Sequence, residues 1–240
     1  MKERVKTAED RSRESYCIIV PAYEEERRVS RVVQSVQPYC RDIVVVDDGS
    51  SDRTAEEARR AGAVVVVHEV NRGKGAAIST GIRYAREHGF DFAVAMDGDG
   101  QHAPEDIPAF VEAYIRGGAP VILGNRMGRS DRMPFVRRMT NRFMSWLLSR
   151  EMGQTVPDTQ CGFRLYRCDA MPGISEESQR FDYDSEVLLA FAERGVTIGA
   201  VPVKVIYGDE KSKIHPVKDT IRFFRMLRKF RTRKRKGDSS

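Results

Sequence analysis

Two aspartates separated by one residue are the clearest chemical feature of this 240-residue sequence. Asp97 and Asp99 lie in the run Asp97-Gly98-Asp99-Gly100-Gln101, directly after an apolar segment. Two carboxylates on a turn that leaves a strand can converge on a hard divalent cation, whose shell substrate phosphates usually complete; Gln101 adds a neutral oxygen. A cation there would neutralise charge developing on a departing diphosphate. The alternative is an acidic turn that caps the next helix.

Two further polar motifs also follow apolar segments. In VDDGS, residues 46–50, Asp48 can accept hydrogen bonds from a nucleobase or a ribose, or it can cap a helix. In PAYEE, residues 21–25, Tyr23 can stack on a base and Glu25 can reach a sugar or base group. The alternative for PAYEE is an ordinary strand-to-helix turn, because short motifs of this kind are weak on their own.

The segments that must position these motifs alternate between two periodicities. Helical stretches separate short β-branched apolar runs near residues 16–20, 43–46, 63–67, 92–96 and 120–123. This alternation predicts an α/β protein with a mostly parallel central sheet and helices on both faces. Ligands of such sheets bind at the carboxyl ends of the strands. Because the three motifs follow three strands, we expect them to converge on one crevice.

Length and composition exclude several classes of protein. A chain of 240 residues with 40% hydrophobic and 32% charged residues can build one core, or two coupled lobes. It is not disordered, collagen-like or a disulfide scaffold. No apolar run approaches the roughly 18 residues that cross a bilayer, and the start of the chain lacks the apolar core of a signal peptide. Four cysteines without a CxxC pair are typical of reduced thiols in a cytosol.

Positive charge is concentrated near the C-terminus. Residues 218–236 contain ten basic residues and one acid, a net charge of +9, which leaves −3 on the rest of a chain whose total is +6. Such a segment attracts nucleic acid or anionic lipid headgroups. No aromatic platform or known nucleic-acid-binding motif accompanies it, so we do not expect nucleic acid as a partner.

Two amphipathic helices are predicted in the second half of the chain. Residues 221–230 place phenylalanines on one sector and arginines and lysine on another, and residues 134–152 mix basic residues with aromatic ones, including Trp146. Both patterns suit a helix in a membrane interface near anionic lipid. The alternative for both helices is ordinary packing on the core.

Taken together, the motifs resemble those of family 2 glycosyltransferases, and among them the polyprenyl-phosphate sugar transferases such as dolichyl-phosphate mannosyltransferase. The resemblance extends over about residues 16–215, and its motifs occur in the order and spacing typical of that family. The matching segments are residues 21–25, 44–54, 71–77, 96–106, 124–126, 158–164, 207–208 and 211–213.

The resemblance implies a nucleotide-diphospho-sugar transferase fold of the GT-A type and inverting transfer that depends on Mg²⁺ or Mn²⁺. It implies three groups of site residues. The residues implied to bind the donor are Pro21, Tyr23, Glu25, Val46, Asp48, Asp97, Gly98, Asp99, Gln101, Arg126 and Lys213. Those implied to bind the metal are Asp97, Asp99 and Gln101, and those implied to contact the acceptor phosphate are Arg126, Arg164 and Lys213. Inserted residues before Lys213 make its alignment looser than the rest.

The acceptor decides whether a base is needed. A lipid phosphate is already anionic near neutral pH, whereas a hydroxyl group of a glycan or small molecule needs a general base. The candidates for that base are Asp182, Asp184 and Glu186, and Asp182 is counted with Asp97 and Asp99 as a catalytic residue. Asp182 and Asp184 can instead cap the helix that begins near Asp184. Arg164 can hold a phosphate or pair with one of these acids. GDP and UDP both remain open as the donor nucleotide.

The expected organisation follows from these motifs. We expect a flexible head (residues 1–15), a catalytic domain (16–215) and a basic amphipathic helix and tail (216–240). The catalytic domain divides into a nucleotide-sugar half, about 16–103, and an acceptor half, about 104–215. The expected protein is a peripheral enzyme on the cytoplasmic face of a membrane that uses a nucleotide-diphosphate sugar and a lipid-phosphate acceptor. It can also have a membrane-protein partner.

Overall fold

The computed structural model describes residues 7–129, 135–172, 183–204, 206, 223–228 and 230–232. The chain divides into two compact units, residues 1–207 and 208–240. Helical backbone is described at 223–228 and 230–232 in the second unit, so it extends two residues beyond the predicted helix at 221–230. No helix among the described residues is long and apolar enough to cross a bilayer.

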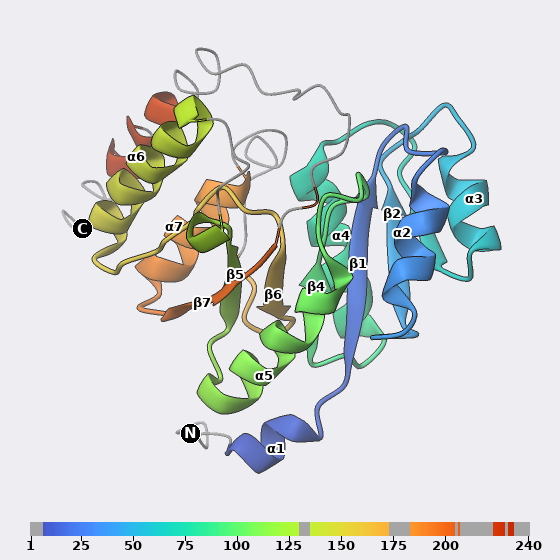
Figure 1. The fold of residues 1–240 in the computed structure, drawn as a ribbon, viewed down its shortest axis with the longest axis horizontal. Coiled ribbons are helices and arrows are strands. Elements are labelled where there is room, and N and C mark those ends of the chain that lie inside the picture. The colour runs from blue at the N-terminus through green and yellow to red at the C-terminus, as the bar shows by residue number, and fades with distance from the viewer. Residues whose placement is uncertain are drawn as a thin grey trace. The chain divides into compact units, whose positions relative to one another are not determined.

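Seven strands form one sheet in the first unit, in the order β3-β2-β1-β4-β6-β5-β7 (Figure 1). Parallel pairing joins β1 to β2 and β4, β2 to β3, and β5 to β7, whereas β6 runs antiparallel to both β4 and β5. The strands are β1 (Tyr16–Ala22), β2 (Ile43–Asp47), β3 (Val64–Val67), β4 (Phe92–Ala95), β5 (Val121–Asn125), β6 (Arg164–Arg167) and β7 (Ile198–Pro202).

Helices cover both faces of this sheet. Alternate residues of β1 point to opposite faces, and both sets are buried, as expected for a strand covered on two sides. Helices α2 and α5 pack on one face and α4 and α7 on the other. The helices are α1 (Ala8–Ser12), α2 (Val29–Val36), α3 (Thr54–Arg60), α4 (Lys74–Glu87), α5 (Ile107–Gly117), α6 (Phe135–Met152) and α7 (Tyr183–Glu193), with short 3₁₀ turns η1 (Pro104–Asp106) and η2 (Met127–Arg129). The predicted α/β class, with a mostly parallel central sheet and helices on both faces, is confirmed.

In the head of the chain, α1 is helical, and its Arg11 Nε donates to the carbonyl of Ile115 over 2.8 Å. Three elements differ from the sequence-based expectation. Helix α2 begins at Val29 instead of Glu25, because residues 24–26 donate their backbone N–H groups to side chains of residues 50–54. Strand β7 is shorter than the predicted run 196–207. The antiparallel strand β6 was not predicted.

Candidate active site

The carboxyl ends of β1, β2 and β4 lie along one edge of the sheet, because these three strands are parallel. The turn after β4 comes close to the end of β1: a Cβ placed on Gly98 would lie only 3.1 Å from the carbonyl oxygen of Pro21. Antiparallel β6 begins at the same edge, where Arg164 pairs with Ala95 of β4 and with Leu123 of β5. The predicted convergence of three motifs on one edge is therefore confirmed, and β6 brings a fourth segment to it.

Asp97 is the centre of a charged cluster at this edge. Its Oδ1 atom lies 2.6 Å from the ammonium of Lys74, the first residue of α4. The same ammonium lies 3.6 Å from Oδ2 of Asp184 on α7. Lys74 thus joins the acidic turn after β4 to the helix in the predicted acceptor half of the chain.

The charges of this cluster are stable at neutral pH. Burial would raise the pKa of Asp97, but Lys74, His102 and Arg126 outweigh it and lower the pKa to about 2. Burial would lower the pKa of Lys74, but Asp184 and Asp97 outweigh it and raise that pKa above its ordinary value. Asp97 is consequently an ionised carboxylate that already faces a cation.

His102 holds the acidic turn in shape. Its Nδ1 atom accepts the backbone N–H of Asp97 over 3.0 Å, and its ring stacks on Phe163 with centroids 4.9 Å apart. Burial, the largest influence, lowers the pKa of His102 to about 4 even though Asp97 opposes the shift, so the ring is neutral at pH 7. Asp99 Oδ1 accepts the N–H of Gln101 over 2.9 Å within the turn. His102 is therefore a hydrogen-bonding residue of this turn.

Arg126 follows β5 and is almost completely buried. Its guanidinium makes a two-pronged contact with Asp158, with Nε 2.7 Å from Oδ2 and Nη2 2.9 Å from Oδ1. This geometry is the strong form of an arginine–carboxylate pair. Arg126 therefore affects the site through its positive charge, which helps to lower the pKa of Asp97.

Arg164 is fully buried at the start of β6. It donates to the carbonyls of Cys161, Thr159 and Asp184 over 2.7 to 2.9 Å. Its Nη2 atom also lies 3.6 Å from Oδ1 of Asp184. Of the two roles expected for Arg164, pairing with an acid is the one that the structure contains. A direct contact with an acceptor phosphate would require these carbonyl bonds to break.

Asp48 organises the neighbouring loop. Its Oδ1 atom accepts from the N–H of Arg72 over 2.9 Å and lies 2.7 Å from Nδ1 of His68, and its Oδ2 atom accepts from the N–H of Gly73 over 2.7 Å. Gly49, at φ 75°, leaves no room for a Cβ, which would lie 2.6 Å from the backbone of Val70. Asp48 thus supports the loop that leads into Lys74, and its predicted contact with a nucleoside stays a prediction.

The remaining donor residues frame the same edge. Tyr23 is exposed, whereas Pro21 and Val46 are buried in the strands. Glu25 is almost buried, and its Oε2 atom lies 2.8 Å from Nη1 of Arg28. Only Tyr23 of these four presents a large exposed side chain. Asp182 and Lys213 lie outside the described residues.

Residues that sequence analysis placed outside the site also belong to the cluster. Lys74 and Gly162 appeared there only within the matching segments 71–77 and 158–164. A Cβ on Gly162 would lie 2.9 Å from Asp97 Oδ2 and would clash with Lys74 Nζ. The only signal for Gly162 was its place two residues before Arg164, because nothing in the sequence indicated that β6 would run beside β4.

The residues present fit a divalent cation. Within the described ranges, no group of three or more His, Cys, Asp or Glu side chains is arranged around one point. Mg²⁺, however, is usually held by one or two carboxylates together with substrate phosphates. The ionised Asp97, which already attracts an ammonium, and its neighbour Asp99 supply that donor set, and Gln101 could add an amide oxygen.

Comparison with known proteins identifies relatives over most of the chain. The family model described as "Glycosyl transferase family 2" matches residues 17–173. A UDP-N-acetylglucosamine–dolichyl-phosphate N-acetylglucosaminyltransferase from Methanococcus voltae is 33% identical and covers 79% of this chain and 85% of its own. An undecaprenyl-phosphate mannosyltransferase from Micrococcus luteus is 32% identical and covers 69% of this chain and 72% of its own.

Solved structures share the fold. Glucosyl-3-phosphoglycerate synthase from Mycobacterium tuberculosis, in complex with UDP, superimposes with a TM-score of 0.67 at 20% identity over 89% of this chain and 80% of its own. The same enzyme in complex with Mn²⁺, UDP and glucosyl-3-phosphoglycerate gives a TM-score of 0.64 at 19% identity over 88% of this chain and 79% of its own. The predicted GT-A type of fold is confirmed.

Proposed function

The chain belongs to glycosyl transferase family 2, and we propose that it moves a sugar from a nucleotide-diphosphate donor to a polyprenyl-phosphate acceptor. One observation carries the proposal: relatives named for polyprenyl-phosphate acceptors are 32 to 33% identical over 69 to 79% of this chain. The charged cluster around Asp97 supplies the matching chemistry, because it combines an ionised carboxylate with buried and half-buried cations at the ligand-binding edge of the sheet.

The donor lies along the edge formed by β1, β2 and β4 in this proposal. Tyr23 is available to stack on the base, and the loop supported by Asp48 faces the ribose and diphosphate. Asp97, Asp99 and Gln101 would hold Mg²⁺ or Mn²⁺. That cation would neutralise the charge that develops on the departing nucleoside diphosphate. Lys74 lies beside the same position and offers a positive charge to the diphosphate.

The bond changes require no strong base. An oxygen of the lipid phosphate forms a bond to the anomeric carbon, the bond from that carbon to the donor diphosphate breaks, and the nucleoside diphosphate leaves with the electron pair. The phosphate oxygen is already anionic near neutral pH. Asp184, the described acid nearest to Asp182 along the chain, is flanked by Lys74 and Arg164. We assign it a positioning role between the two halves of the site.

The enzyme acts at the membrane surface in this proposal, because a polyprenyl phosphate resides in a bilayer. We place it peripherally, on the cytoplasmic face. The net charge of +9 between residues 218 and 236 supports this location, since each basic residue near anionic lipid contributes about 1 kcal/mol of attraction.

A partition assay tests the function. The full-length protein is incubated with a panel of radiolabelled UDP- and GDP-sugars, a polyprenyl phosphate and Mg²⁺ or Mn²⁺, and the organic and aqueous phases are separated. We expect label from one donor to enter the organic phase, and chelation of the cation to prevent it. The Asp99→Asn variant should fold normally and lose at least roughly 100-fold in turnover, because it removes a ligand charge.

Two results of this assay would contradict the proposal. Label transferred only to a soluble glycan or small molecule would show that the acceptor is a hydroxyl group and would overturn the proposed acceptor. Full turnover by Asp99→Asn at ordinary Mg²⁺ concentration would overturn the metal assignment.

A further inference from the structure

Five large apolar side chains of helix α6 are exposed on the face that points away from the domain. The face that packs on the domain contains Asn141, Met144, Ser145 and Leu148, two of which are polar. Ser145 Oγ lies 3.1 Å from the hydroxyl of Thr159 and accepts the N–H of the same residue over 3.0 Å. Helices on the surface of a globular domain normally show the reverse pattern, with the apolar stripe against the core.

The opposite face of α6 is an exposed stripe of large apolar residues. Their side chains are 48 to 66% exposed, and they belong to Phe135, Val136, Met139, Phe143 and Trp146. The rings of Phe143 and Trp146 stack with centroids 6.1 Å apart. Single exposed apolar residues are ordinary, but a continuous stripe marks a surface that meets a partner. We call these five residues the outer face of α6.

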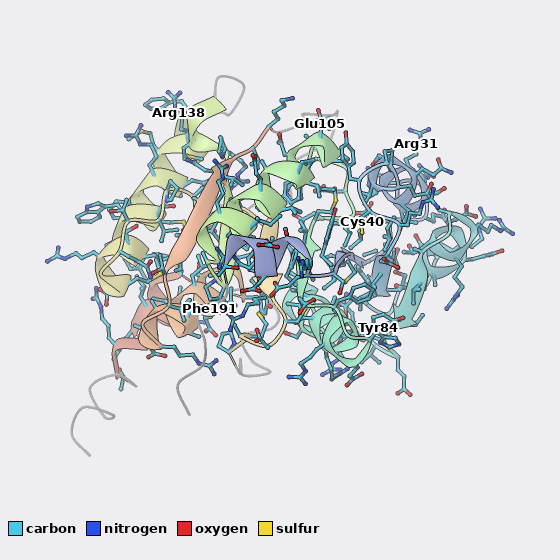
Figure 2. All side chains as sticks on the ribbon, turned by 90° about the horizontal axis from the view of Figure 1, so that it is seen from below. Arg31, Cys40, Tyr84, Glu105, Arg138 and Phe191 are labelled. Carbon is cyan, nitrogen blue, oxygen red and sulfur yellow. The ribbon has the colours of Figure 1, made fainter. Side chains whose placement is uncertain are left out.

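Arginines accompany this face, and no acid interrupts it. Helix α6 contains four arginines and a single acid, Glu151, which lies in its last turn and is not one of the five residues of the outer face. Arg142 and Arg150 are exposed, and Figure 2 shows Arg138 projecting outward from α6. The guanidinium of Arg138 lies 5.7 Å from the centre of the Phe135 ring. Apolar rings and positive charges therefore lie together on this side of the helix.

We propose that the outer face of α6 docks on the anionic lipid surface of the membrane. Aromatic rings and arginines together suit the boundary between headgroups and acyl chains, where rings enter the apolar layer and guanidinium groups stay with lipid phosphates. The inference rests on the proposed function, since it supplies the contact that a lipid-linked acceptor requires. It concerns a surface of the catalytic domain itself and not the basic segment near the C-terminus.

The positive charge beside the outer face favours an anionic membrane over a second copy of the chain as its partner. Two copies that met through their outer faces would bring Arg138, Arg142 and Arg150 of both copies together, and none of the five residues of the outer face is acidic. Like charges at close range oppose such contact. An anionic bilayer instead offers both an apolar layer and the opposite charge.

The single tryptophan of the chain reports directly on this contact. Trp146 is the only one in the sequence, and it belongs to the outer face, where its side chain is exposed. The full-length protein is mixed with vesicles of phosphatidylglycerol and phosphatidylcholine, or of phosphatidylcholine alone. We expect the emission to shift to shorter wavelength with the anionic vesicles, and brominated acyl chains to quench it. Unchanged emission, or an equal response to neutral vesicles, would overturn the proposal.

A matched pair of variants separates this face from the rest of the surface. Phe143→Glu places a negative charge on the outer face, and Tyr39→Glu makes the same kind of change at an exposed aromatic residue just after α2. In flotation assays, we expect Phe143→Glu to weaken vesicle binding roughly tenfold or more, since it removes a ring that would enter the apolar layer of the bilayer. We expect Tyr39→Glu to bind like the wild type. Equal losses in both variants would overturn the proposal, as would self-association that Phe143→Glu abolishes.

A comparison of two acceptors distinguishes failure of the docking surface from failure of the proposed function. With a short, water-soluble polyprenyl phosphate, Phe143→Glu should transfer sugar as fast as the wild type, and with a long-chain acceptor in vesicles it should be slower. If the wild type binds vesicles but transfers sugar to neither acceptor, the proposed function fails and the docking surface stands. If it transfers sugar to both acceptors but never binds vesicles, the docking surface fails alone.

Discussion

The ion pair between Lys74 and Asp97 defines the site at the scale of single residues. The ammonium lies 2.6 Å from the carboxylate and stands at the first position of α4, where the helix dipole disfavours a positive charge. Its location is therefore explained by Asp97 and Asp184 and not by the helix. Gly162 packs directly against this ion pair. A side chain at that position would overlap the ammonium of Lys74 and press on the carboxylate of Asp97, so the cluster requires a glycine there.

Replacing Gly162 with alanine should damage catalysis more than stability. The new methyl group would displace the flexible Lys74 side chain and press on both oxygens of Asp97. A shift of about 1 Å in reacting groups can cost on the order of 100-fold in rate. We expect kcat/KM to fall by about that factor while the midpoint of urea unfolding changes little.

Gly117→Ala is the control for this prediction. Gly117 ends α5 at an exposed position, and a Cβ there would meet nothing within 4 Å. Its activity should equal that of the wild type. A Gly162→Ala enzyme with unchanged kcat/KM would contradict the crowded geometry around Asp97.

At the scale of elements, strand β6 explains why the site could be predicted only in part. The three acidic or aromatic motifs follow parallel strands whose apolar, β-branched sequences are recognisable, so their convergence was predictable. Strand β6 has only four residues, Arg164–Arg167, and starts with a buried arginine. Its pattern resembles no isolated strand, and its antiparallel insertion between β4 and β5 depends on tertiary packing. Gly162 consequently reached the site unpredicted, whereas Arg164 was predicted there only from its family motif and not from the strand that carries it.

The contact between β5 and the segment before β6 depends on one buried ion pair. Asp158 is completely buried and binds the guanidinium of Arg126 with both oxygens. Asp158→Ala would leave that charge buried without its partner, which typically costs about 3–5 kcal/mol. We expect a loss of that size in the free energy of unfolding, measured by urea denaturation.

A surface pair provides the comparison. Glu9 and Arg13 form an ion pair in which both side chains are 77% exposed. Arg13→Ala should change the free energy of unfolding by less than about 1 kcal/mol, as exposed pairs usually do. Similar losses in Asp158→Ala and Arg13→Ala would show that the Arg126 pair does not hold these elements together.

The whole molecule combines a catalytic unit with a short second unit. The boundary between the two units lies after residue 207, and the expected end of the catalytic domain at residue 215 stays a prediction. The expectation rested on the last family motif, at residues 211–213, whereas the division of the structure reflects which residues contact one another.

Buried thiols report on the integrity of the whole fold. All four cysteines are buried and free. Burial raises the pKa of Cys161 to about 11 and that of Cys168 to about 12, and it raises the pKa values of Cys17 and Cys40 as well. Because the thiolate is the reactive form, we expect the native protein to resist a thiol reagent at pH 8 and to release all four thiols on unfolding in urea. Rapid labelling of the native protein would contradict the packed core.

The central claim is that a divalent cation at Asp97 and Asp99 binds the diphosphate of the sugar donor. Crystals soaked with Mn²⁺ and either UDP or GDP test it through the anomalous scattering of manganese. We predict a manganese peak within coordinating distance of the Asp97 or Asp99 carboxylate and of the diphosphate oxygens. A bound nucleotide without such a peak, or manganese located away from both aspartates, would contradict the account.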